Sequence, residues 1–264
     1  MRDLTLTLGI SEQHLHIVFI KDEEIQYIKE RSITSNGTEI LGPLIIESLE
    51  KAQFSLQQIS RIACIAGPGS FTGLRLALTT AIAMRRALSI PLATLNYLHV
   101  IAASAWALPE LQNISLLPSL LRVITYARQK LLYIQDFLVT KTFPMPIAKP
   151  RISSIEASIQ TKDPILFMGS GIQYNYSFFA EHALINPNIL LFQKKISISP
   201  YALLQLVKNI PHEEWKHNDP EPLYLRHCDA VDNLSSISLK QGKNPEDACS
   251  TFKKIVTQPP LLVT

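Results

Sequence analysis

The sequence predicts an α/β protein whose sheets combine antiparallel and parallel strands. Apolar residues stand at alternate positions at 4–9, 15–19 and 25–28, which is the period of half-buried strands linked by hairpins. Apolar residues at helical spacing follow at 38–53, and a short apolar run at 62–66 indicates a buried strand. A meander followed by strands with helical crossovers is typical of a ribonuclease-H-like lobe.

The remaining elements continue this mixture. We expect helices at 72–88, 97–107, 153–160 and 201–209, and strands at 92–95, 120–125, 131–139 and 165–168. The sequence becomes polar and loses its periodicity from Asp229 onward. We therefore predict an N-terminal lobe over 1–110, a C-terminal lobe over 111–228 and a flexible tail over 229–264.

Composition excludes several classes of protein. With 264 residues, 47% of them hydrophobic, the chain can build one large or two small domains and is not disordered throughout. The net charge of +3 is too small to indicate nucleic-acid binding by itself. Cys64, Cys228 and Cys249 form no zinc or redox pattern, and the seven histidines show no metal-ligand spacing. We expect no metal site, no signal peptide and no membrane span, and a reduced, cytoplasmic location.

A glycine-rich loop leads into a long apolar helix at 66–88, AGPGSFTGLRLALTTAIAMRRAL. Its glycines are too close for a Walker A loop, and Gly73 comes one residue late for a dinucleotide fingerprint. No glycine lies two residues before or after Ser70, which a nucleophile elbow requires. A helix N-terminus still offers N–H groups to an anion, so a phosphate site and a purely structural turn both remain open.

The helix after this loop is apolar or small on nearly every side. Its charged residues are Arg75, Arg85 and Arg86. One side is expected to pack on the sheet, and the other to meet further core or a helix of another chain.

Two motifs resemble a known family. The run Gly67, Pro68, Gly69, Ser70, Phe71, Thr72, Gly73, Leu74, Arg75 resembles the signature of the TsaB (YeaZ) family, and EPLYLR at 221–226 is similar to its Pro-x-Tyr-Leu-Arg ending. The resemblance covers residues 1 to about 228. It implies an actin-like ASKHA fold of two ribonuclease-H-like lobes.

The resemblance also implies a role. Members of this family are non-catalytic subunits that pair with the homologue TsaD. The complex transfers a threonylcarbamoyl group to the adenosine next to the anticodon in tRNAs that read ANN codons. It implies no catalytic residue and no cofactor on this chain, with ATP or ADP at the boundary of the complex. Further implied partners are the ATPase TsaE and tRNA, both through the complex.

The resemblance implies docking on TsaD through the first two helices. On this chain the corresponding residues are Leu41, Leu44, Ile45, Ser48, Thr72, Leu74, Ala77, Leu78, Ala81, Met84 and Arg85. It favours the interpretation of the glycine-rich loop as a turn that orients the second helix towards a partner.

Departures from the family pattern leave alternatives. Residues 7–11, TLGIS, lack the acid that related folds carry at the end of strand one, and Tyr126 replaces the acid of an Asp-Ala-Arg turn. A small-molecule kinase or ATPase of the same fold needs that acid. A divergent homodimeric binding protein, self-associating through the same helices, is a further alternative. A peptidase has no supporting Ser-His-Asp or metal-ligand pattern.

Overall fold

A computed structural model describes residues 4–33, 37–111, 118–140, 143–225, 234–242, 244–247 and 250. The chain separates into one compact unit that ends at Leu225 and a second over 226–264. The first unit contains both sheets. In the second, the structure describes the helix α9 (Leu234–Lys240).

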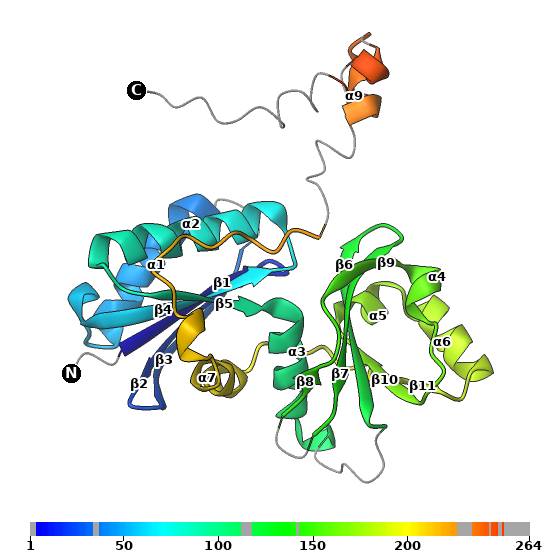
Figure 1. The fold of residues 1–264 in the computed structure, drawn as a ribbon, viewed down its shortest axis with the longest axis horizontal. Coiled ribbons are helices and arrows are strands. Elements are labelled where there is room, and N and C mark those ends of the chain that lie inside the picture. The colour runs from blue at the N-terminus through cyan, green and yellow to red at the C-terminus, as the bar shows by residue number, and fades with distance from the viewer. Residues whose placement is uncertain are drawn as a thin grey trace. The chain divides into compact units, whose positions relative to one another are not determined.

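The first sheet has five strands in the order β3-β2-β1-β4-β5 (Figure 1). The strands are β1 (Leu4–Ser11), β2 (His14–Lys21), β3 (Glu24–Ser32), β4 (Ile59–Gly67) and β5 (Leu92–Asn96). β1 to β3 form an antiparallel meander, whereas β1, β4 and β5 pair in parallel. Glu12 and Gln13 close the first hairpin with positive φ, the backbone geometry that matches the twist of paired strands.

Helices cover both faces of this sheet. α1 (Gly37–Lys51) and α2 (Phe71–Leu88) share one hydrophobic cluster with the β4 residues Ile62 and Cys64. α3 (Tyr97–Trp106) belongs to another cluster, which contains Ala63 and Ile65 of the same strand. Because successive side chains of a strand point to opposite faces, α3 packs on the face opposite α1 and α2.

The second sheet has six strands, ordered β11-β10-β6-β7-β8 with β9 paired to β7. The strands are β6 (Leu120–Arg128), β7 (Leu131–Leu138), β8 (Met145–Pro146), β9 (Arg151–Ser154), β10 (Ile165–Met168) and β11 (Ile189–Leu191). The helices of this half are α4 (Ile155–Ser158), α5 (Ser170–Tyr174), α6 (Tyr176–Ile185) and α7 (Pro200–Lys208). Short 3-10 helices lie at Leu56–Gln58, Pro109–Leu111 and His212–Glu214. Figure 1 shows α3 between the two sheets, and both sheets contribute to its hydrophobic cluster.

The predicted α/β fold with mixed sheets is confirmed, but some elements differ. The helix expected at 153–160 is the end of β9 followed by the short α4, because Ile152 pairs with Tyr133 of β7 and Ser154 caps α4. The structure also contains four elements that the sequence analysis did not predict: the strands β8 and β11 and the helices α5 and α6. They are too short or too weakly periodic to be recognised in the sequence. α9 lies in the expected flexible tail, and most of the rest of 229–264 lies outside the described residues. The lobe boundaries stay predictions.

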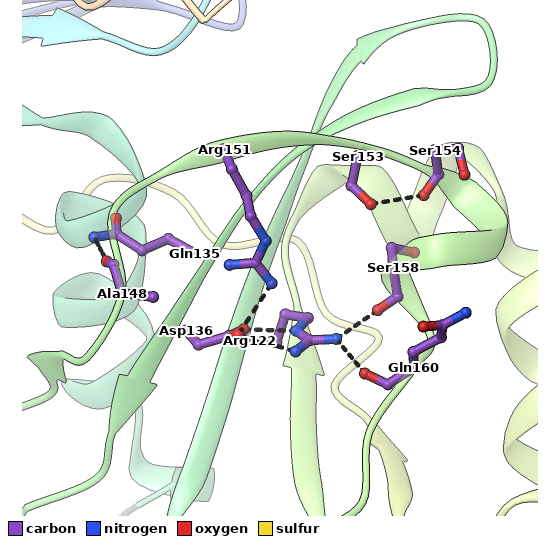
Figure 2. Close-up of polar contacts among 9 residues, drawn as sticks. All are labelled: Arg122, Gln135, Asp136, Ala148, Arg151, Ser153, Ser154, Ser158 and Gln160. Carbon is purple, nitrogen blue, oxygen red and sulfur yellow. Dashed lines mark hydrogen bonds and ion pairs between the residues drawn. The ribbon is translucent and has the colours of Figure 1, made fainter.

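A buried arginine ties the second sheet together. Arg122 donates to both carboxylate oxygens of Asp136, from Nε at 2.6 Å and from Nη2 at 2.9 Å. Its Nη1 donates to the carbonyl oxygens of Ser158 at 2.7 Å and Gln160 at 3.0 Å (Figure 2). Arg151 of β9 adds a bond to Asp136 at 3.2 Å. The network therefore joins β6, β7, β9 and the end of α4.

This network keeps Asp136 ionised. Burial by itself would raise the pKa of Asp136, but the hydrogen bonds from Arg122 and the charges of Arg122 and Arg151 outweigh it, so the pKa lies below its usual value. A carboxyl with a lowered folded-state pKa stabilises the fold above its unfolded-state pKa. That stabilisation is lost as the pH falls through the folded-state pKa.

We predict that Arg122→Met lowers the free energy of unfolding by about 3 kcal/mol at neutral pH, because it leaves the Asp136 carboxylate without its two-point partner. Urea denaturation measures the change. The difference from wild type should shrink in acid, where Asp136 becomes protonated. Lys51→Met, which removes an exposed partner of Glu47, is the control and should have little effect. Equal stability of Arg122→Met and wild type would contradict this account.

Candidate docking surface on helix α2

The glycine-rich loop joins the end of β4 to the start of α2. Ser70 is the N-cap of α2, and its Oγ accepts a hydrogen bond from the Gly73 N–H at 3.5 Å. Gly67 has φ +115°, and a Cβ there would lie 2.8 Å from the Leu74 side chain and 3.0 Å from the Leu223 carbonyl oxygen. Ser70 therefore caps the helix that follows it. The missing side chain of Gly67 leaves room for the backbone of Leu223, which is distant in the sequence.

The two family-like motifs meet at this point. Arg75 Nε donates to Tyr224 Oη at 2.9 Å, and the rings of Phe71 and Tyr224 stack with centroids 4.9 Å apart. The Arg75 guanidinium lies 4.0 Å from the centre of the Phe71 ring. The Leu223 N–H donates to the Ala66 carbonyl at 2.8 Å. Residues separated by about 150 positions therefore build one surface.

We call residues 216–225 the strap, because this segment runs along α2 (Figure 1). It starts at Lys216, whose backbone pairs with Leu92 of β5. The Asp219 carboxylate accepts from Arg85 Nη2 at 2.5 Å and from Arg86 Nη2, and Arg85 also donates to the His217 carbonyl. Two arginines of the last turn of α2 thus hold the middle of the strap.

The charge of Asp219 is maintained by these arginines. Hydrogen bonds from Arg86 and then Arg85 hold the pKa of Asp219 below its usual value. The anchor is therefore present at neutral pH and is lost as the pH falls through this lowered pKa.

The structure corrects the set of predicted docking residues. Eight of them are buried in this chain's own core: Leu41, Leu44, Ile45, Ser48, Leu74, Ala77, Leu78 and Ala81. Arg85 is buried beneath the strap. Thr72 is exposed and Met84 is half-buried. Helical periodicity locates an apolar stripe, but it does not reveal whether that stripe faces the chain's own sheet or another protein. Docking by α1 and α2 stays a prediction.

The exposed sides of these helices offer a different set of side chains. On α1, Ile46 is 60% exposed. On α2, Thr79 and Ala83 are exposed. A groove of about 590 Å³ lies between α2 and the strap, and Ile82 and Pro220 are among the residues that line it. The EPLYLR motif at 221–226 was the one sequence signal for this groove, and no local pattern placed that motif against α2.

Two other expectations concern metal and membrane. Within the described ranges, no three His, Cys, Asp or Glu side chains are grouped closely enough to hold a metal ion. Across the same part of the chain, no helix combines the length and the apolar character needed to span a membrane.

We predict that Tyr224→Ala loosens the strap, because it removes both the ring stack on Phe71 and the acceptor for Arg75. Amide hydrogen exchange at Leu223, whose N–H is bonded to Ala66, should accelerate about tenfold or more. The control is Tyr201→Ala, at an exposed tyrosine of α7. Unchanged exchange at Leu223 would mean that the strap is held by other contacts.

The chain is similar to proteins of tRNA modification. Residues 31–256 match the model of the family described as TsaD: tRNA N6-adenosine threonylcarbamoyltransferase. The tRNA threonylcarbamoyladenosine biosynthesis protein TsaB of Buchnera aphidicola subsp. Schizaphis graminum is 29% identical over 106 residues, which are 40% of this chain and 50% of that protein. TsaB of Haemophilus influenzae is 29% identical over 115 residues, 43% and 48% of the two chains. The chain spans about half the length of these curated relatives.

A solved structure agrees in fold. YeaZ from Pseudomonas aeruginosa matches with a TM-score of 0.64 at 16% identity, over 84% of this chain and 100% of that one. The family match extends over most of the sequence, and several curated relatives of this chain are TsaB proteins. The chain therefore belongs to the family that the TsaD model describes and, within it, to the TsaB (YeaZ) proteins.

Proposed function

We propose that this chain is a non-catalytic accessory subunit that pairs with TsaD as a heterodimer in the cytoplasm. In that complex it supports threonylcarbamoylation of the adenosine next to the anticodon in tRNAs that read ANN codons. The observation that carries this proposal is the meeting of the two family motifs on α2, where Arg75 and Phe71 hold Tyr224. The names of the TsaB relatives support the pathway.

The first strand supports an accessory role over a kinase or ATPase. Phosphoryl transfer relies on a divalent cation, which needs carboxylate ligands. The β1 residues 7–11 carry no carboxylate. Among the residues that the structure describes, no group of three acidic, His or Cys side chains could replace it. In our proposal the chemistry, and any ATP or ADP, belongs to TsaD and to the boundary with it.

The exposed sides of α1 and α2 have the chemistry of a protein interface. Ile46 of α1 and Ala83 of α2 expose apolar atoms, and Arg75 and Arg86 lie on the exposed side of α2. Apolar residues with nearby arginines are typical of interface centres. Because the strap holds α2 from one side, the surface is already ordered before a partner binds, which reduces the entropy cost of docking. TsaE and tRNA would join through the complex.

We predict that Ile46→Glu and Ala83→Glu each weaken binding to TsaD about tenfold or more, because each places a charge in an apolar interface. Both positions are exposed, so the fold should be retained. Isothermal titration calorimetry with TsaD from the same organism measures the affinity. Leu184→Glu, at an 89% exposed position of α6, is the matched control and should bind like wild type.

Two outcomes would contradict the proposal. If both variants bound TsaD like wild type, docking would lie on another surface. If the wild-type chain formed no complex and instead remained a homodimer in the presence of TsaD, the divergent homodimeric binding protein would be the better interpretation. Light scattering on the same samples distinguishes these outcomes.

A further inference from the structure

A second concavity is formed by α7 and the chain segment that contains β8. It has a volume of about 820 Å³. Its described lining residues come from three segments: the end of β5 and the start of α3 (94–99), the segment 143–146, and α7 with the residues that follow it (205–214). Pockets for small molecules span roughly 300–1,000 Å³. This pocket therefore has the size to hold a small organic molecule.

Two walls of the pocket are held in place by the fold. Met145 and Pro146 pair with Leu138 and Phe137 of β7, which fixes the segment around β8. On the α7 side, Leu206 belongs to the same hydrophobic cluster as the residues of α3. Because these walls are ordered without a ligand, binding costs little conformational entropy.

The pocket is apolar and carries a negative charge. Its apolar walls include Leu95, Phe143, Leu206 and Ile210. Among the described residues that line it there is no lysine or arginine, and Glu214 is the one charged side chain. Glu214 is exposed. The lining thus favours an apolar ligand with a positive charge and disfavours an anion.

His99 supplies a fixed polar group in this apolar lining. Its Nε2 lies 3.1 Å from the Pro144 carbonyl oxygen, and its ring packs against Phe137 and Phe143, with centroids 5.5 and 5.4 Å away. A carbonyl oxygen only accepts, so Nε2 carries the proton. Burial lowers the pKa of His99 and outweighs the bond to Pro144, so the ring is neutral at neutral pH. In that neutral ring, Nδ1 is a hydrogen-bond acceptor.

The acceptor Nδ1 is within reach of a ligand. In the part of the chain that the structure describes, no group donates to Nδ1 of His99. Nδ1 is also not one of the fully buried polar atoms that lack a partner. It is therefore accessible, and His99 lines the pocket. A donor that enters the pocket can bond to Nδ1 without displacing any contact of the chain.

We infer that this pocket binds a small organic cation of the arylalkylammonium class. The ligand ammonium donates to His99 Nδ1, and the apolar body packs against Phe143 and Ile210. The Glu214 carboxylate attracts the cation and repels anions such as nucleotides. No described lining residue belongs to α1, α2 or the strap, so the site stands independently of the proposed docking on TsaD.

Nuclear magnetic resonance titration of the full chain with 2-phenylethylammonium tests the inference. We expect binding at millimolar concentration or below, with the largest shifts at the amide signals of His99, Asn209 and Ile210. The probe 3-phenylpropionate has a similar size and the opposite charge. It should bind about tenfold or more weakly, because it cannot donate to Nδ1 and is repelled by Glu214.

Variants test the role of each polar group. His99→Phe keeps an aromatic ring but removes Nδ1, so it should weaken binding of 2-phenylethylammonium about tenfold or more. Glu214→Gln should weaken binding by a few-fold, as expected for an exposed charge, whereas Glu213→Gln, at the adjacent exposed position, is the matched control and should have no effect. Ile210→Trp, which fills part of the pocket, replaces His99→Phe if the latter does not fold, and it should also weaken binding about tenfold or more.

Several outcomes would overturn the inference. These are no binding of 2-phenylethylammonium, equal or tighter binding of 3-phenylpropionate, and shifts confined to residues outside the pocket. Wild-type affinity of His99→Phe, or of Ile210→Trp in its place, would overturn it as well.

Discussion

Burial of α3 between the two sheets is the constraint on which the rest of the structure depends. The residues of α3 at 97, 98 and 100–106 are all buried, so each side of the helix must meet apolar partners. Ser104 satisfies its hydroxyl within this core, because it donates to the Val100 carbonyl at 2.7 Å and accepts the Ser199 N–H at 2.9 Å. The second of these bonds fixes the start of α7. One helix thus sets the positions of both sheets and of α7.

The residues of the α2 motif make their contacts with the strap and with their own helix. Gly67 has no side chain at the point where the Leu223 carbonyl and Leu74 come close. Tyr224 stacks on Phe71 and accepts a hydrogen bond from Arg75. Asp219 pairs with the arginines of the last turn of α2. These contacts order the outer side of α2 while its apolar stripe packs on the sheet. The proposed docking function follows from this order, because a partner meets a rigid helix flanked by a fixed segment.

Periodicity predicted most of the first sheet and its helices, because those elements are long and have one buried face. It could not predict which surface covers an apolar stripe, so Leu41 and Ala77 were expected at an interface and are in the core. The strap has no regular secondary structure and contacts residues about 130 to 150 positions away, so no local pattern reveals its place.

Hydroxyl-radical footprinting of the chain, alone and with TsaD, tests most directly the claim that the exposed sides of α1 and α2 form one docking surface with the strap. This measurement reports side-chain exposure residue by residue. We predict that TsaD protects Ile46 and Tyr224 from the radicals. Leu184 of α6 and Tyr201 of α7 lie outside the proposed docking surface and should stay as reactive as in the free chain. Protection of Leu184 or Tyr201 with no change at Ile46 and Tyr224 would contradict it.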